Sequence, residues 1–196
     1  MAGRKSRAVI KRVSFSVFWQ PLSKQEGIDP KQWCYETAPD SKVVKLKEKY
    51  LSLQGYRLPT EAEAEYATRA DAVTSRFYGE SEKLLSKYGW YLKNSEEHSW
   101  SVGTTKPNDF GLFDTLGNVF CWCQERYKDS PQSKDVTPSE DVEDAVVINN
   151  QETRVLRGAA YDVTASYLRC ASRHDYLPTY HVNTAGFRVA RTFTLD

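Results

Sequence analysis

The clearest pattern of apolar and polar positions lies between residues 117 and 123. Gly117 and Asn118 tolerate positive φ, so the chain can reverse direction there. After this pair the side chains alternate, with Val119, Cys121 and Cys123 on one side and Phe120 and Trp122 on the other. A period of two residues predicts a buried strand that sends Trp122 into the core. We therefore expect the fold to be organised around this strand.

A second pattern, between residues 55 and 70, predicts the start of a helix. Thr60 is followed three residues later by Glu63, the spacing of a capping box in which a hydroxyl and a carboxylate bind the first free backbone amides. Glu61 and Glu63 also lie at the positive end of the helix dipole. We interpret these carboxylates as groups that begin a helix rather than as a general acid and base.

The remaining segments are short and are broken by glycine and proline. Residues 9–18 alternate like an edge strand, although the apolar residues between 15 and 22 also fit a helical stripe. Residues 23–49 have the polar composition of loop and short helix, and short strands are expected at 154–156, 167–172 and 186–193. Many short strands, long loops and two or so helices predict an α+β fold with a small, mainly antiparallel sheet.

Length and charge narrow the classes of function. A chain of 196 residues fits one domain, and a net charge of +1 argues against nucleic-acid or membrane-surface partners that are recognised through bulk charge. No apolar run approaches the roughly 20 residues that cross a bilayer. The basic start of the chain is followed by an apolar stretch too short for a strong signal peptide, which favours a cytoplasmic location.

Candidate metal ligands are few. The four cysteines, Cys34, Cys121, Cys123 and Cys170, are too scattered for a disulfide scaffold, so we expect reduced thiols, with a bridge at Cys34 or Cys170 as the alternative. Cys121 and Cys123 share one face of the predicted strand, but a structural zinc needs four ligands, and no second cysteine pair exists. His98, beside two glutamates, and the acidic residues between 140 and 144 are interpreted as water-exposed loop.

Four phrases in the sequence occur in an order that resembles a known family. They are RLPTEAE at 57–63, FGLFD at 110–114 followed by GNV at 117–119, RVLRG at 154–158, and GFRVAR at 186–191. In this order they are similar to the sulfatase-modifying factor family, which is typified by the formylglycine-generating enzyme. The resemblance implies a C-type-lectin-like variant fold for residues 23–196. Residues 1–22 would be a replaced or truncated N-terminal segment, and a truncated copy of a longer protein is one interpretation.

The resemblance implies copper chemistry that the residues do not match. In that family two cysteines that follow an Arg-Gly-Gly phrase bind copper, and thiolates suit Cu(I) because both are soft. The corresponding residues here, 158–168, contain no cysteine. Cys170 matches a structural half-cystine of the family, and Thr68 stands where its partner is expected. We therefore expect no copper and no resident cofactor.

A calcium site is the second metal site that the resemblance implies. Its ligands would be the Asp114 side chain, the Gly117 and Val119 carbonyls, and a glutamate at the position of Cys121. Because calcium prefers oxygen ligands, the thiol at Cys121 predicts a weak calcium site or none.

The sequence also departs from the family pattern in the size of several side chains. Ala64 and Phe120 stand where the family has tryptophan, and Ala159-Ala160 replaces Gly-Ser. A large side chain at position 64 would pack against Leu58. Its loss is expected to cost about 3–5 kcal/mol unless neighbouring residues fill the gap.

The predicted function is that of a non-catalytic recognition module, a use made of the same fold in retroelement-diversified variable proteins. Tyrosines give contact area at low entropic cost, and His and Asp add hydrogen bonds. The predicted ligand-binding residues are Tyr161, Asp162, Tyr167, His174, Tyr176, Tyr180 and His181. Two alternatives remain: a sulfatase-maturation oxidoreductase or redox relative that uses other residues, and an accessory domain whose catalytic partner is another chain.

Overall fold

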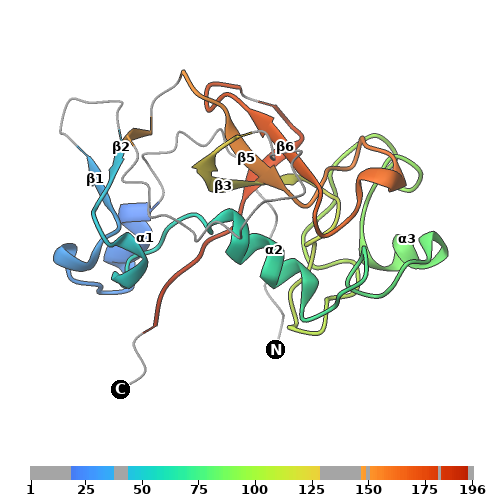
Figure 1. The fold of residues 1–196 in the computed structure, drawn as a ribbon, viewed down its shortest axis with the longest axis horizontal. Coiled ribbons are helices and arrows are strands. Elements are labelled where there is room, and N and C mark those ends of the chain that lie inside the picture. Colours follow the sequence, from blue (N-terminus) through green and yellow to red (C-terminus); the bar gives the residue numbers. More distant parts are fainter. Residues whose placement is uncertain (1–18, 38–43, 129–146, 149–150, 181, 194–196) are drawn as a thin grey trace, which may run out of the picture.

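The computed structural model describes residues 19–37, 44–128, 147–148, 151–180 and 182–193, which form an α+β fold. Its helices are α1 (Trp19–Gln25), α2 (Glu61–Arg69) and α3 (Leu85–Tyr88), and its strands are β1 (Tyr35–Thr37), β2 (Val44–Leu46), β3 (Phe120–Arg126), β4 (Val147–Ile148), β5 (Arg154–Arg157), β6 (Arg173–Tyr176) and β7 (Ala185–Phe187). A long irregular segment connects α3 to β3 (Figure 1). In these ranges no helix has the length and apolar character needed to span a membrane.

Two sheets carry the fold. The larger has the order β6-β5-β3-β7, in which β3 pairs antiparallel with β5 and parallel with β7, and β5 pairs antiparallel with β6. The smaller joins β1, β2 and β4 and lies near α1 at one end of the molecule (Figure 1). The expected mainly antiparallel sheet with few helices and much loop is confirmed.

Two of the strands expected from the sequence need correction, and a third cannot be compared with the structure. The segment 167–172 is no strand, because it forms the end of a 3-10 turn and further turns, and β6 begins only at Arg173. The last strand ends at Phe187, since Ala190 instead exchanges two backbone hydrogen bonds with Arg57, at 2.8 and 3.0 Å. The edge strand expected at 9–18 lies outside the described residues.

The turn before β3 follows the signal in the sequence. Gly117 and Asn118 have positive φ values of 83° and 66°. A Cβ atom at Gly117 would collide with the backbone carbonyl oxygen of Trp90, so this close approach requires glycine. The strand that follows places Trp122 in the core, as predicted.

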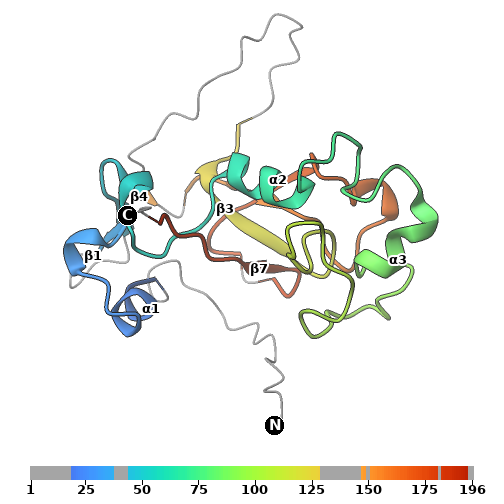
Figure 2. The same ribbon diagram turned by 90° about the horizontal axis from the view of Figure 1, so that it is seen from below.

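The predicted start of α2 is confirmed in detail. The Thr60 hydroxyl accepts a hydrogen bond from the Glu63 N–H at 3.1 Å, and the Glu63 carboxylate accepts one from the Thr60 N–H at 2.8 Å. The same carboxylate receives two bonds from the buried Arg57 guanidinium, at 2.6 and 2.7 Å. The helix packs against β3 and β5 (Figure 2). Glu63 therefore ties the start of the helix to the core.

Alternation along the strands divides the larger sheet into two faces. Strand register places Cys121, Arg157 and Arg173 side by side on the face toward α2. The other face is aromatic and carries Phe120, Trp122, His174, Tyr176 and Phe187. Trp19 of α1 packs edge-on against Phe187, with ring centres 5.4 Å apart. Residues 19–22 of the expected N-terminal segment thus belong to α1, and Trp19 contributes to the core.

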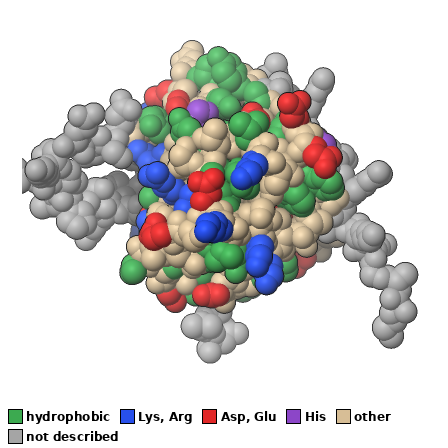
Figure 3. Space-filling view, turned by 90° about the vertical axis from the view of Figure 1, so that its right-hand side faces the viewer, with side chains coloured by type: hydrophobic (Ala, Val, Ile, Leu, Met, Phe, Trp, Pro, Cys, Tyr) green, Lys and Arg blue, Asp and Glu red, His purple; other side chains and the backbone are tan. Residues whose placement is uncertain are grey.

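The surface on the α3 side of the molecule carries mixed charge. Figure 3 shows Lys and Arg side chains interspersed with Asp and Glu, and apolar groups scattered between them. His98 is exposed and packs against Trp100 with ring centres 4.7 Å apart, which agrees with the expected water-exposed loop. On this side no single sign of charge dominates, as the net charge of +1 suggests.

Candidate ligand-binding site

A cleft of about 440 Å³ opens on the aromatic face of the larger sheet, beside β6. The His174 ring stacks on Phe120, with ring centres 4.9 Å apart and planes at 22°. Tyr176 meets His174 edge-on at 4.8 Å and also packs against Trp122. Because these rings stand on paired strands, the floor of the cleft is fixed by the core of the sheet.

Four of the predicted ligand-binding residues line this cleft, and a fifth lies beside it. Asp162, Tyr167, His174 and Tyr176 line it. Tyr180 lies next to Tyr176, with 6.1 Å between ring centres, and 54% of its surface is exposed. The structure therefore gathers side chains from two separate loops and one strand around one hollow.

The other two predicted residues do not lie there. Tyr161 is only 6% exposed, its N–H donates to the Asn118 carbonyl at 2.9 Å, and its own carbonyl accepts from the Ser95 hydroxyl at 3.0 Å. Burial raises the pKa of the Tyr161 phenol, and the Asp162 charge adds to the rise. These contacts give Tyr161 a structural role. His181 lies outside the described residues.

The structure adds cleft residues that sequence reasoning did not single out. Phe120, Val163, Thr164 and Ser172 also line the hollow. Alternation along β3 predicts the face on which Phe120 lies. Its contact with His174 depends on the pairing of β3, β5 and β6, which no local signal in the sequence reveals.

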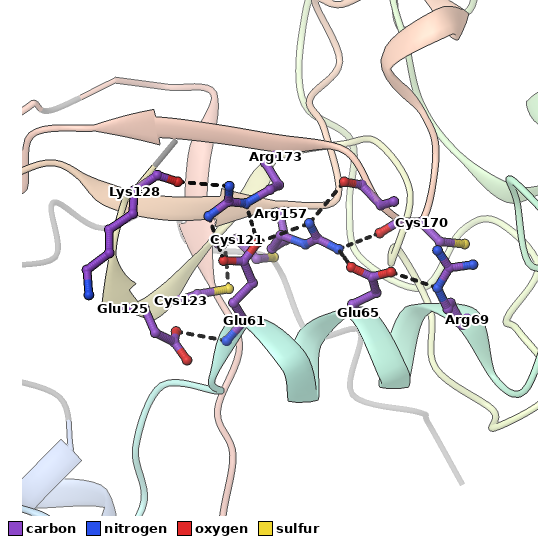
Figure 4. A network of polar contacts seen from close by, with 11 residues as sticks. Glu61, Glu65, Arg69, Cys121, Cys123, Glu125, Lys128, Arg157, Cys170 and Arg173 are labelled. Carbon is purple, nitrogen blue, oxygen red and sulfur yellow. Dashed lines mark hydrogen bonds and ion pairs between the residues drawn. The ribbon is translucent and has the colours of Figure 1, made fainter. Parts of the chain in front are cut away.

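On the opposite face an ion-pair network links α2 to β5 and β6 (Figure 4). Arg157, which is 3% exposed, donates to Glu61 Oε1 at 3.2 Å and to the Glu65 carboxylate. Arg173 donates two bonds to Glu61, from Nε at 2.6 Å and from Nη2 at 2.9 Å. One carboxylate of α2 is thus shared by arginines of two neighbouring strands, which agrees with a structural interpretation of Glu61.

This network positions the wall of the cleft. Arg157 also donates to the carbonyls of Cys170 at 2.7 Å and Ala171 at 3.1 Å, and so holds the loop before β6. Arg173 and His174 are consecutive on β6, and consecutive strand residues point to opposite faces. Binding Arg173 to α2 therefore directs His174 into the cleft.

All four cysteines are free thiols, so the alternative of a bridge at Cys34 or Cys170 is not what the structure shows. Burial raises the pKa of each thiol, to about 11 for Cys34 and well above the ordinary value for Cys123. None of the four lines the cleft beside β6. Near neutral pH these groups are protonated thiols that are packed away from the candidate site.

The pattern that defines the sulfatase-modifying factor enzyme 1-like domain matches residues 18–193. The chain belongs to this family. The formylglycine-generating enzyme of Streptomyces coelicolor is 32% identical over 157 residues, which cover 72% of this chain and 48% of that enzyme. The serine/threonine-protein kinase pkn1 of Chlamydia pneumoniae is 32% identical over 153 residues, which cover 72% of this chain and 22% of that kinase. The chain thus spans half or less of these relatives.

Solved structures share the fold of this sulfatase-modifying factor domain. Treponema denticola variable protein 1 superposes with a TM-score of 0.65 at 32% identity, over 76% of this chain and 50% of that protein. CarF superposes with a TM-score of 0.63 over 88% of this chain and 62% of CarF, and at 21% identity this likeness concerns the fold alone. The predicted family and fold are therefore confirmed.

The residues of this chain do not provide the pair of copper-binding cysteines that the sulfatase-modifying factor family has. Residues 162–164 and 167, from the stretch where that pair is expected, line the cleft and offer carboxylate, hydroxyl and phenol groups but no sulfur. The neighbouring thiols of β3, Cys121 and Cys123, lie on the α2 face, and burial raises the pKa of both. Cu(I) prefers thiolates, so this donor set does not suit it.

The expected calcium ligands fit only in part. Asp114 is 9% exposed, its Oδ2 accepts from the Gly103 N–H at 2.7 Å, and its Oδ1 is buried without a hydrogen-bond partner. That oxygen would suit a cation. Burial raises the pKa of the Cys121 thiol, while the adjacent Arg188 guanidinium opposes the rise. A neutral thiol and a fixed positive charge disfavour a hard cation, and the weak calcium site stays a prediction.

The gap expected at Ala64 is present. A cavity of about 390 Å³ lies between α2 and the C-terminal segment, and Ala64 lines it together with Pro59 instead of Leu58. Pro59 precedes the N-cap residue Thr60, the position from which an apolar staple packs against the fourth helical residue. Phe120, the other residue that stands where the family has tryptophan, is by contrast buried and stacks on His174.

Proposed function

We propose that this sulfatase-modifying factor domain is a non-catalytic ligand-binding module and that the cleft beside β6 is its binding site. The observation that carries the proposal is the chemistry of the cleft wall. Rings held rigidly by the sheet form its floor, polar side chains from two loops form its rim, and no thiol lines it. Rigid rings with a polar rim are typical of binding surfaces, because they bury area at low entropic cost.

The side chains indicate the kind of ligand. Phe120, His174 and Tyr176 offer flat apolar surface, and Tyr167 and Tyr180 extend it into solvent. Asp162 is exposed and forms no ion pair within the described residues, so its carboxylate is free to accept hydrogen bonds. A ligand with one apolar face and several hydrogen-bond donors complements this arrangement.

The test compares variants of the full chain on glycan and peptide arrays. Tyr176→Ala combined with Tyr180→Ala is expected to remove the signals that the unmodified chain gives. Tyr66→Ala, which removes an exposed tyrosine from α2, is expected to keep them. If loss of the Tyr176 packing unfolds the chain, Tyr167→Ala with Tyr180→Ala makes the same test, since both are exposed. Unchanged binding by a folded double variant would contradict the proposal.

A second candidate function is that of a sulfatase-maturation oxidoreductase, which the identity to the Streptomyces coelicolor enzyme favours. Its test is incubation of the chain in air with copper and a sulfatase-derived peptide, so that dissolved oxygen is the oxidant. Mass spectrometry then follows conversion of the peptide cysteine to an aldehyde. Conversion faster than with copper alone would establish an oxidase and would refute the non-catalytic assignment.

A further inference from the structure

A second cavity, distinct from the cleft, lies on the α2 face of the larger sheet. Cys121 lines this cavity, whereas its neighbour Phe120 lines the cleft, so β3 separates the two hollows. The volume is about 390 Å³. For comparison, a dry apolar cavity of about 150 Å³ can hold one benzene ring. The space beneath α2 is therefore sufficient for a two-ring compound with a short side arm.

The walls of the cavity are mainly apolar. The cavity stays open because the residues around it are either too small to fill it or are held in place by ion pairs. Ala64 and Ala67, three residues apart, lie on the same face of α2 and extend only methyl groups toward the cavity. Leu112, Val189 and Ala190 complete the apolar wall. The longer Glu63 and Arg157 side chains also line the cavity. Glu63 is held by an ion pair with Arg57, and Arg157 is held by ion pairs with Glu61 and Glu65. The cavity is thus preformed.

Two polar groups at this cavity could bind a ligand. Thr115 is 6% exposed, and its hydroxyl forms no hydrogen bond. Arg188 donates to the Phe113 carbonyl and faces the Cys121 thiol, but we find no carboxylate paired with it among the described residues. Since buried polar groups are almost always hydrogen-bonded, a buried hydroxyl without a partner, beside a guanidinium that no carboxylate neutralises, indicates a ligand.

The charges around Arg188 indicate on which side an anion would lie. A neighbouring hollow of about 480 Å³ shares Leu112, Cys121 and Arg188 with the apolar cavity, and it is also lined by Asp114. The Asp114 carboxylate repels anions from that hollow. Glu63 also lines the α2 cavity, but its carboxylate is paired with Arg57, whereas Asp114 forms no ion pair within the described residues. An anion that pairs with Arg188 is therefore favoured on the α2 side, next to the apolar walls.

We infer that the cavity beneath α2 binds a small aromatic carboxylate. Its ring system lies between the alanines of α2 and Val189, its carboxylate pairs with Arg188, and the Thr115 hydroxyl bonds to its polar edge. This site is independent of the proposed cleft, because the two hollows open on opposite faces of the sheet.

The test is calorimetric titration of the full chain with indole-3-acetate, indole and tryptamine. Indole-3-acetate is expected to bind most tightly, and tryptamine at least about tenfold more weakly, because its ammonium group meets Arg188. Arg188→Gln is expected to lower the affinity for indole-3-acetate to that for indole and to leave indole binding unchanged. Equal affinity for the three compounds, or no saturable binding of indole-3-acetate, would overturn the inference.

Variants of α2 locate the site. Ala64→Trp fills the cavity and is expected to weaken indole-3-acetate binding at least about tenfold, whereas Ala62→Trp, at an exposed position of the same helix, leaves it unchanged. Ala67→Leu, a smaller filling change, serves if the tryptophan variant does not fold. Tyr167→Ala with Tyr180→Ala, at two exposed positions, is expected to retain the binding, which separates this site from the cleft. Full affinity in a folded filling variant would refute the assignment.

Alkylation by iodoacetamide gives an independent readout. Cys121 lines the cavity, whereas Cys34 lies elsewhere in the core. Bound indole-3-acetate is expected to slow alkylation of Cys121 and to leave the rate at Cys34 unchanged, as measured by peptide mass spectrometry. Equal Cys121 rates with and without saturating ligand would place the ligand outside the cavity and contradict the inference.

Discussion

Replacing Glu61 with alanine removes the carboxylate that α2 shares between β5 and β6. Arg157 loses a partner at 3.2 Å, and Arg173 loses two bonds of 2.6 and 2.9 Å. Arg157 is almost completely buried, so part of its charge is left without compensation. The loop before β6 and the orientation of His174 depend on these contacts, and the change is therefore expected to weaken both the fold and the cleft.

The magnitude follows from the exposure of each pair. Stranding a buried charge costs about 3–5 kcal/mol, but Arg157 keeps the Glu65 carboxylate and two backbone carbonyls, which reduces its share to about 2 kcal/mol. The Arg173 pair, whose two side chains are 23% and 22% exposed, adds about 1 kcal/mol. The sum, about 3 kcal/mol, corresponds to a melting temperature lower by about 6–12 °C in a chain of this size.

Urea unfolding followed by tryptophan fluorescence measures this loss, since Trp122 is in the core. Glu82→Ala, at an exposed position, is the control and is expected to change the free energy of unfolding by less than about 0.5 kcal/mol. Glu61→Gln separates charge from shape and is expected to lie between the two. A loss below about 1 kcal/mol in Glu61→Ala would show that the network does not hold β6 against α2.

Three further predictions concern pH, backbone strain and thiol access. Burial alone would raise the pKa of Glu63, but hydrogen bonds and charge attraction from Arg57 lower it. The stability that the Glu63 carboxylate contributes is therefore present above its unfolded pKa of about 4.3 and is lost as the pH falls below that value. Glu63→Gln is expected to flatten this part of a plot of the urea midpoint against pH. Gly117→Ala is expected to cost at least about 2 kcal/mol more than Gly103→Ala, since both have positive φ but only the first Cβ would collide with backbone, and equal losses in thermal unfolding would refute this. Cys123, fully buried with a raised pKa, is expected to react with iodoacetamide only upon unfolding, and rapid native labelling in a peptide map would contradict its burial.

The sequence predicted many of the individual residues of the candidate site, but it did not predict which of them lie together in space. The tyrosines and His174 stand out in the sequence because they cluster in loop-like segments. Four of the seven predicted residues line the cleft, and Tyr180 lies beside it. Tyr161 has the same composition signal but lies in the core, because two backbone hydrogen bonds to distant segments hold it there. The sequence places Phe120 only in the core strand, and its role in the cleft follows from sheet pairing.

The sequence by itself determined the features that depend on a few neighbouring residues. The Thr60–Glu63 capping box, the reversal at Gly117 and the alternation along β3 are set by hydrogen bonds and dihedral angles within a few positions, and each is present as expected. The family, too, follows from the order of short phrases along the chain.

Only the tertiary structure decided which distant residues meet. The parallel pairing of β3 with β7, the sharing of Glu61 by Arg157 and Arg173, and the cavity beneath Ala64 all join segments far apart in sequence. Their energies depend on sheet register, burial and the space that packed side chains leave, and none of these quantities is encoded locally. The cleft and the cavity exist because β3 presents rings to one side and a small thiol to the other, where α2 extends only the methyl groups of Ala64 and Ala67 into the space between them.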